Sequence, residues 1–559
     1  MSNYSIIIFV LLIISFQTIN VQSQSVDYCD ALYSSLMFYK AQRAGKLPDS
    51  EVYWRSNSVL QDGTLADPSW TDIDLSGGFF DAGDYIKFTF PMAYSMNVLA
   101  WSYIEYKDNI NNKCHLQTQY LSVLKYGTDW LINTLVSDDL LVTQIDVMDS
   151  HNLWNTPNTL TYERKIFTVS STQPCTDVAM QSASTLAAAA MVWKDIDATY
   201  SAKCLATAKR MYSLGSRCPN GNMVVPDSAQ GYTSSGWKDE KAMAAIWMYL
   251  ATGKDTSQSY FNDMLAALSD IKNYGFNSIW NAVISWDSKY AGAAVLAYRQ
   301  LMNDANLAQG SVTKTDLTNM ATQLLTTWTS QSKISGIVSY SSGWKWGNNR
   351  YATGGAFLAS LINTNASTQF ATQQINCVLG KCAENSYSYL IGFGTNYPKN
   401  PHHRAAHNPT VVNSAQSIDT PAQNTYVLKG ALMGGPSLDL TTFSDTRANY
   451  IQNEPALDYN AAFTGALAGL VNFEHTTGYK YSDNSQPSST TTTTSTTGAS
   501  STTTTSAQST TNTAQTSAAA AQSSDDDKPN PKISAATTLS SSSSIWLISS
   551  FVILSLLSS

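Results

Sequence analysis

Short apolar runs with helical spacing recur along most of this chain, and they limit it to a helical fold. Met92, Met96, Leu99 and Tyr103 follow one another at intervals of three or four residues, as the buried face of a helix does. Strand-like alternation is scarce, and small side chains that let helices pack closely are common. Residues 24–483 are therefore predicted to form one all-α domain of roughly a dozen helices. Alanine-rich runs repeat the pattern at 183–193, 242–250, 291–301, 357–362 and 461–471.

So many helices can be arranged as a closed ring of helix pairs or as an open solenoid. No exact repeat is visible in the sequence, and this disfavours the solenoid. The 559-residue chain is long enough to bury a large core. Its formal net charge is −8, and the lack of a basic excess argues against nucleic acid as a partner. The 14 Trp and 30 Tyr residues suit a cleft that binds the flat faces of sugar rings, although core packing accounts for them equally well.

Both ends of the chain differ in composition from the helical part. Residues 1–23 contain an apolar run and a small-residue cleavage site, which are typical of a secretory signal, with a short transmembrane anchor as the alternative. Residues 484–533 are rich in Ser, Thr and Ala and predict a disordered, O-glycosylated linker. Residues 534–559 resemble a signal for a glycolipid (GPI) anchor, with a tail anchor or loose apolar tail as the alternative. The protein is therefore expected outside the cell, attached to its outer surface.

The chain has seven cysteines, and an oxidising compartment would pair some of them. The odd number leaves at least one cysteine free or intermolecular, and Cys377 and Cys382 are close enough to bridge a loop. Connectivity cannot be read from spacing. A zinc site is not expected, because the cysteines form no CxxC pair and the six histidines are not spaced to complete one.

Two acidic clusters that stand far apart in the sequence carry the functional signal. The first reads GGFFDAGD over residues 77–84 and is followed by Lys87, and the second reads NEPALDYN over residues 453–460. Cleavage of a glycosidic bond needs one carboxyl group that donates a proton and one that activates water or attacks the sugar. Asp81 and Asp84 flank a glycine in a loop, so their carboxylates are expected near one spot where they could hold a water molecule. A helix cap or a calcium loop is the alternative.

Both clusters, together with a third stretch, resemble signatures of glycoside hydrolase family 9, which contains many endoglucanases. The third stretch begins SYLIGFGTN at residue 388 and ends PHHR at residues 401–404. The three stretches keep the family's order over about residues 27–481. Enzymes of this family use an (α/α)6 barrel, so the resemblance implies that architecture, with an active face built by the loops between helices.

The resemblance also implies roles for the acidic residues. Asp84 is expected to be the general base, and Asp81 to help orient the attacking water. Glu454 matches the general acid, which must be desolvated to stay protonated near neutral pH; a merely solvated Glu is the alternative. Asp445 is assigned a supporting catalytic role, through hydrogen bonds either to Arg404 or to the loop.

Further residues are expected to hold the sugar. The resemblance implies that His402 and Arg404 bind sugar hydroxyls and tune the carboxylates. His151 and Trp154 match the family's His-x-x-Trp substrate segment, although Asn155 and Thr156 depart from the charged pattern often seen there. Tyr459 is expected to border the scissile bond. Trp344 and Trp346 lie in a glycine-rich loop and are expected to stack on further glucose units, and core packing is the alternative for each Trp.

A structural calcium ion is the only metal that the resemblance suggests. Ser235, Gly236, Asp239 and Glu240 are similar to a calcium loop of some members, and Asp287 would complete it. Ca²⁺ takes about six or more oxygen ligands, which carboxylates and backbone carbonyls would supply. The same residues suit the start of a helix equally well. The chemistry itself is expected to need no cofactor.

These observations predict an endo-1,4-β-glucanase that cleaves internal bonds of cellulose or a related β-1,4-glucan with inversion. Two alternatives stay open at this point: a catalytically silent glucan-binding or wall-organising protein, and an exo-acting β-glucanase. The presence of Asp81, Asp84 and Glu454 together argues against the silent protein, which would have no physical need for all three.

Overall fold

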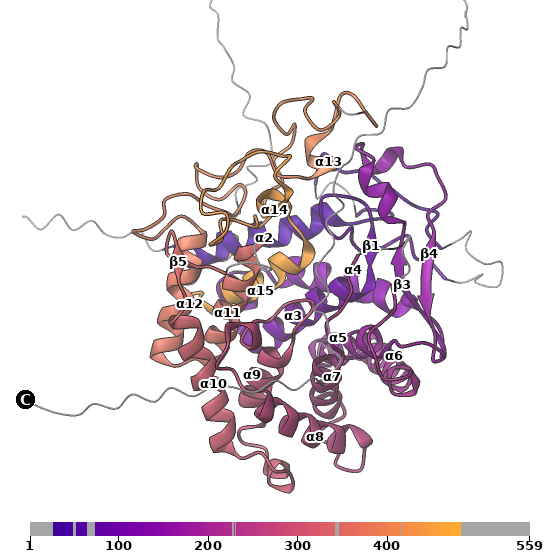
Figure 1. Ribbon diagram of the computed structural model, residues 1–559, viewed down its shortest axis with the longest axis vertical. Helices are drawn as coiled ribbons and strands as arrows, with labels where there is room; N and C mark the ends of the chain where they lie inside the picture. The colour runs from indigo at the N-terminus through magenta and orange to yellow at the C-terminus, as the bar shows by residue number, and fades with distance from the viewer. Residues whose placement is uncertain are drawn as a thin grey trace, which may run out of the picture. The chain divides into compact units, whose positions relative to one another are not determined.

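Twelve helices of twelve or more residues form the framework of the described chain in a computed structural model (Figure 1). The structure describes residues 26–48, 52–63, 73–225, 229, 231–340, 346–414 and 416–481. The predicted signal, linker and anchor segments and Trp344 lie outside these residues. The helices are α2 (Tyr28–Gln42), α3 (Thr89–Asp108), α4 (Gln117–Thr134), α5 (Thr176–Trp193), α6 (Ala198–Arg217), α7 (Lys238–Ala251), α8 (Ser259–Tyr274), α9 (Tyr290–Leu301), α10 (Lys314–Thr329), α11 (Asn348–Ile362), α12 (Asn365–Val378) and α15 (Leu457–Gly469).

Six of these helices form a closed inner ring. In the order α3, α5, α7, α9, α11 and α15, each helix contacts the next, and α15 returns to α3. Each of the other six packs mainly against one helix of the ring: α2 against α15, α4 against α3, α6 against α5, α8 against α7, α10 against α9, and α12 against α11. This is the (α/α)6 barrel that the resemblance implied, and the all-α prediction is confirmed.

The distribution of alanine explains which helices lie inside. All five alanine-rich runs of the sequence fall on α5, α7, α9, α11 and α15, which belong to the inner ring. A helix of this ring has neighbours on nearly every side, and its side chains are almost all buried, as they are along α5 and α15. By contrast, α6 and α8 bury only one face. Small side chains therefore let the inner helices approach one another closely.

A small antiparallel sheet, which the sequence analysis did not predict, lies beside the barrel. It contains β1 (Lys87–Phe88), β2 (Leu135–Ser137), β3 (Leu140–Ile145) and β4 (Ile166–Val169), and β3 pairs with the other three strands. The pairing sets Lys87 opposite Ile145. It therefore holds the segment before β1 close to the segment after β3. A second hairpin joins β5 (Lys333–Ile334) to β6 (Ile337–Val338).

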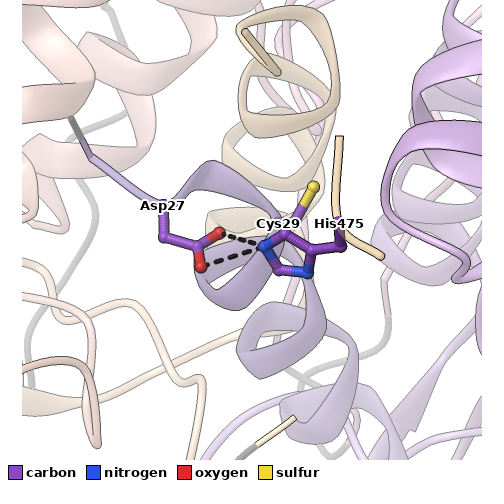
Figure 2. A group of neighbouring side chains, drawn as sticks. All are labelled: Asp27, Cys29 and His475. Atoms are coloured by element: carbon purple, nitrogen blue, oxygen red, sulfur yellow. Dashed lines mark hydrogen bonds and ion pairs between the residues drawn. The ribbon is translucent and has the colours of Figure 1, made fainter. Parts of the chain in front are cut away.

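Covalent and ionic links fasten the barrel. Disulfides join Cys29 to Cys114, Cys175 to Cys218 and Cys377 to Cys382. Cys204 is a buried free thiol, which confirms the expectation from the odd number. Asp27, the N-cap of α2, pairs with His475 at 3.0 Å, so the first described helix is tied to the segment after α15 (Figure 2). Among the described residues, no helix combines the length and the apolar character needed to cross a membrane.

Candidate active site

The predicted acid and base of the two acidic clusters lie just before the N-termini of neighbouring inner helices. Asp81 and Asp84 precede α3, and Glu454 precedes α15. Tyr232 precedes α7, and Trp346 precedes α11. All these helices enter the ring in the same direction, because an outer helix follows or precedes each of them and returns the chain. The loops therefore meet at one end of the barrel and bring together residues that are hundreds of positions apart.

Gly83 is the point where the three sequence motifs touch. Its backbone N–H donates to Glu454 Oε1 at 3.3 Å, and its carbonyl accepts a hydrogen bond from the Arg404 N–H at 3.0 Å. A Cβ atom at position 83 would lie 2.0 Å from the carbonyl oxygen of His402. Close approach of these backbones therefore requires glycine at position 83.

The loop that carries the two aspartates is fixed from behind by Lys87. The Lys87 ammonium is fully buried, pairs with Asp62 at 2.6 Å, and donates to the carbonyls of Leu75, Ser76 and Gly77 at 2.5, 3.2 and 3.1 Å. Burial lowers the pKa of Lys87 to about 8, and the Asp62 carboxylate opposes this shift. Lys87 therefore acts as a structural cation beneath the site.

Asp84 is held in its ionised form. Burial alone would raise the pKa of its carboxyl, but hydrogen bonding and the charge of His151 outweigh burial and hold the pKa below its ordinary value. Asp84 Oδ2 lies 2.6 Å from Nδ1 of His151, and Oδ1 accepts the Ile86 N–H at 3.1 Å. The unpredicted sheet produces this contact, since Asp84 lies three residues before β1 and His151 six residues after β3.

The surroundings of Glu454 favour its protonated form. Its side chain is buried, and the loss of solvation raises its pKa above the ordinary value; the negative charge of Asp84 adds to this shift, and the charge of His151 opposes it. One barrel end thus holds two carboxyl groups whose pKa values are moved in opposite directions. This division is the one that an acid and a base need.

Asp81 lies in the most enclosed position of the three. It is 3% exposed, and burial raises the pKa of its carboxyl well above the ordinary value, although a hydrogen bond from Tyr232 opposes the shift. The Tyr232 hydroxyl donates to Oδ2, while Oδ1 has no hydrogen-bond partner among the described residues. Oδ1 is therefore a buried atom with unused hydrogen-bonding capacity, and the predicted role of Asp81 in orienting the water stays a prediction.

His402 and Arg404 lie against these carboxyl groups. His402 Nδ1 donates to the Arg447 carbonyl at 2.8 Å, and burial lowers the pKa of this imidazole to about 3, so the ring is neutral. Arg404 is 2% exposed and donates to the carbonyls of His151 and Leu153. Arg404 therefore fastens the His151 loop beside the carboxyl groups, and the predicted contacts of both residues with sugar hydroxyls stay predictions.

Trp154 is packed beneath the site. It is 6% exposed, its Nε1 donates to His407 Nδ1 at 2.7 Å, and its ring lies 4.9 Å from that of His402. The Arg404 guanidinium lies 4.6 Å from the same ring. This geometry fits the core alternative for Trp154, in which the ring supports His402 from below.

Asp445 acts on the backbone of the third motif. Its carboxylate accepts the N–H groups of Lys399 and Asn400 at 2.7 and 2.9 Å, directly before the PHHR segment. Of the two partners considered for Asp445, the structure therefore shows the loop.

The aromatic residues predicted to bind sugar differ in exposure. Trp346 is 36% exposed and lies 5.0 Å from the Tyr450 ring, so it presents a free face for stacking. Tyr459 is only 3% exposed and lies beneath the Arg350 guanidinium, 5.1 Å from it. Whether either residue binds the glucan stays a prediction.

The residues of the predicted calcium loop lie near one another around a lysine. Asp239 and Glu240 form the first turn of α7, whose N-cap is Trp237 rather than Ser235. The Ser235 N–H donates to Asp287 at 2.6 Å, and Gly236 follows Ser235 in the chain. The full list of predicted ligands is Ser235, Gly236, Asp239, Glu240 and Asp287.

A buried ammonium already balances the charge of this loop. Lys289 Nζ pairs with Glu240 at 2.7 Å, both side chains being almost fully buried, and the Lys289 N–H donates to Asp239 at 2.7 Å. Oε2 of Glu240 has no hydrogen-bond partner among the described residues, so one oxygen is free for a cation. The calcium site stays a prediction, and Lys289 would compete with the ion for these carboxylates.

Three contributors to the site were not found from the sequence. Tyr232 lies outside every motif, and nothing in its neighbourhood marks it as a partner of Asp81. Arg350 pairs with Asp458 at 3.0 Å beneath the same cluster. Asp458 follows Glu454 within the second acidic cluster, so its position could have drawn attention to it.

Comparison with known proteins agrees with this geometry. Residues 28–467 match the sequence profile described as Glycosyl hydrolase family 9. The chain belongs to this family. An endoglucanase of Dictyostelium discoideum is 38% identical over 483 residues, which cover 84% of this chain and 64% of that protein.

Solved structures give the same result for the fold of this family 9 member. The structure of an endoglucanase from the termite Nasutitermes takasagoensis at pH 2.5 is 31% identical, with a TM-score of 0.69, and the match covers 80% of this chain and 99% of the termite chain. The endoglucanase CelQ of Clostridium thermocellum, solved with cellotetraose, is 29% identical with a TM-score of 0.64; the match covers 79% of this chain and 70% of CelQ. The chain is therefore a glycoside hydrolase.

Proposed function

We propose that this glycoside hydrolase is an endo-1,4-β-glucanase, in which Glu454 is the general acid and Asp84 the general base. The observation that carries the proposal is the opposite environment of the two carboxyl groups at one barrel end. Family membership and relatives named endoglucanases support the activity, and nothing observed favours a silent binding protein or an exo-acting enzyme. The cello-oligosaccharide in the CelQ structure supports β-1,4-glucan as the substrate class.

The reaction follows from the protonation states. Glu454, whose pKa is raised by burial, gives its proton to the glycosidic oxygen as the bond to the anomeric carbon breaks. Asp84, ionised beside His151, takes a proton from a water molecule that attacks the opposite face of the sugar. Asp81, three residues before Asp84 in the same loop, is assigned to orient this water. An inverting site needs room for the water, so the two carboxyl groups are expected about 6.5–9.5 Å apart.

Paired substitutions test these roles. Glu454→Gln and Asp84→Asn keep the size of each side chain, and each should lower kcat on carboxymethyl cellulose by about 10²–10⁴-fold or more. Glu454→Gln should be less damaging on an aryl glycoside with a good leaving group, which needs no proton. Asp138→Asn is the control, since that carboxylate is 77% exposed and pairs with Arg210 of α6.

The mode of cleavage has its own measurement. Viscosity of carboxymethyl cellulose should fall early relative to the release of reducing ends, because internal bonds are cut. NMR of the first product should show the α-anomer. Release of the β-anomer would mean retention and would overturn the assignment of Asp84 as a base.

We further propose that the protein is secreted and held at the outer cell surface by a glycolipid, with an optional Ca²⁺ at the 235–240 loop. The three disulfides support an oxidising compartment. The small residues at 534–536 and the apolar end support the anchor. A phosphatidylinositol-specific phospholipase should release the protein from intact cells, and a mature protein that retains Leu557 would contradict the anchor.

A further inference from the structure

Three groups of His, Cys, Asp or Glu side chains among the described residues bring their ligand atoms within 4.8 Å of one another. Two of them contain cysteines that are already in disulfides. Cys29 of the group in Figure 2 is bonded to Cys114, and Cys377 and Cys382 of another are bonded to each other. These sulfurs offer no thiolate to a metal. The third group, His151, His402 and Glu454, keeps all its ligand atoms.

Each imidazole of this group is oriented by a hydrogen bond at Nδ1. His402 Nδ1 donates to the Arg447 carbonyl at 2.8 Å, and His151 Nδ1 lies 2.6 Å from the Asp84 carboxylate. Histidine ligands of metals are held in this way, with one ring nitrogen bonded to a carbonyl or carboxylate and the other bound to the metal. Nε2 is therefore the remaining ring nitrogen of each histidine.

The free nitrogen of His402 is an unsatisfied polar atom in a buried place. His402 is 5% exposed, and its Nε2 has no hydrogen-bond partner among the described residues. The Trp154 ring, 4.9 Å away, holds the imidazole in place. The His151 side chain is 35% exposed and gives solvent access to the group. The group thus has imidazole rings already oriented by hydrogen bonds and a path by which an ion could enter from solvent.

We propose that His151, His402 and Glu454 form a binding site for a transition-metal dication, with Zn²⁺ as the probe, and that the bound ion blocks hydrolysis. Two imidazole nitrogens and one carboxylate oxygen are a ligand set that zinc accepts, with a fourth position for water. Binding displaces the proton of Glu454 and one proton of the charged His151 imidazole, because the carboxylate must be ionised and the imidazole neutral to coordinate the ion. The blocking part rests on the proposed role of Glu454 as the general acid; the binding part does not.

The spacing of residues in the sequence does not reveal this site. His151 and His402 are separated by more than half the length of the catalytic domain, so no short metal-binding pattern joins them. The expectation of no zinc site, drawn from the spacing of cysteines and histidines, therefore did not test this arrangement.

Calorimetry with ZnCl₂ in a non-chelating buffer tests binding on the full chain. Wild-type protein should bind one ion at this site, and zinc should raise its thermal unfolding temperature by mass action. Glu454→Gln and His151→Gln each remove one ligand and should weaken zinc binding at least about tenfold. Asp84→Asn removes only the carboxylate behind His151 and should weaken it by about 10–100-fold. Co²⁺ as a second probe should give a tetrahedral visible spectrum that the same variants lose.

Asp27→Asn is the matched control, because it alters the group of Figure 2 and leaves the proposed site intact. Its zinc affinity should equal that of the wild type. Wild-type affinity in Glu454→Gln and His151→Gln, both checked for folding by thermal unfolding, would overturn the binding site, as would the absence of one-to-one binding in the wild type. Where one variant does not fold, the other and Asp84→Asn decide.

Inhibition separates the two parts of the proposal. Zinc should inhibit hydrolysis of carboxymethyl cellulose at the concentration at which it binds, and a chelator should restore the rate. Binding that depends on these residues but leaves the rate unchanged would overturn the blocking part and count against Glu454 as the general acid.

Discussion

Replacing Gly83 by alanine should disable the enzyme without unfolding it. The added Cβ would lie 2.0 Å from the His402 carbonyl oxygen and 3.1 Å from Glu454 Oε1. Real Cβ atoms essentially never come within 3.0 Å of another heavy atom, so the loop must move away from His402 by about 1 Å. This movement strains the hydrogen bonds of Gly83 to Glu454 and to Arg404.

The magnitude follows from where Gly83 lies. It stands between Asp81 and Asp84, so the shift moves the water-activating side of the site relative to the proton donor. A misplacement of about 1 Å costs about 100-fold in rate, and overpacking a well-packed site costs about 1–3 kcal/mol of stability. We therefore expect kcat on carboxymethyl cellulose to fall about 100-fold, with a modest decrease in unfolding temperature.

Gly77→Ala, in the same motif, is the control. A Cβ at Gly77 would meet nothing within 4 Å, so activity and stability should stay close to those of the wild type. Reducing-end kinetics and thermal unfolding are measured on both variants. Full activity of folded Gly83→Ala would refute the argument that close contact at this position sets the distance between acid and base.

Two other predictions follow from the charges of the site. The pH profile of kcat/KM should be bell-shaped. The midpoint of the acid limb reports protonation of Asp84 and should lie below the ordinary pKa of 3.8, because the pKa of Asp84 is lowered. The midpoint of the alkaline limb reports ionisation of Glu454 and should lie above 4.5, because the pKa of Glu454 is raised. An alkaline limb at or below pH 4.5 would contradict the burial of Glu454. Lys87→Met should cost about 3–5 kcal/mol in urea unfolding, because it leaves Asp62 and three carbonyls without the buried ammonium. Lys125→Met, which breaks an exposed pair with Asp129, should cost about 0–1 kcal/mol. Equal losses of stability in the two variants would contradict the difference drawn between the buried and the exposed ion pair.

Much of the fold could be predicted from the sequence, because helix periodicity and residue size are local properties. Met92, Met96 and Leu99 marked the buried face of α3, and the alanine-rich runs predicted five closely packed helices, which the structure places in the inner ring. The closed ring itself came from the family resemblance. The small sheet was missed because its strands are short, and β1 has only two residues, too few to show alternation.

For the candidate site, too, some features could be predicted from the sequence and others could not. Asp81, Asp84 and Glu454 could be named from the sequence, because carboxyl chemistry limits the residue types and the motifs are long. Their contacts could not be named: Tyr232 on Asp81, His151 on Asp84 and the Gly83 N–H on Glu454 each join distant segments. A pKa depends on burial and on charges a few ångströms away, and such distances exist only after the chain has folded. The sequence by itself determined which groups are available for acid–base chemistry and which helices can pack closely. The tertiary structure alone decided that the pKa values of Glu454 and Asp84 move in opposite directions, because the fold buries Glu454 and sets His151 against Asp84.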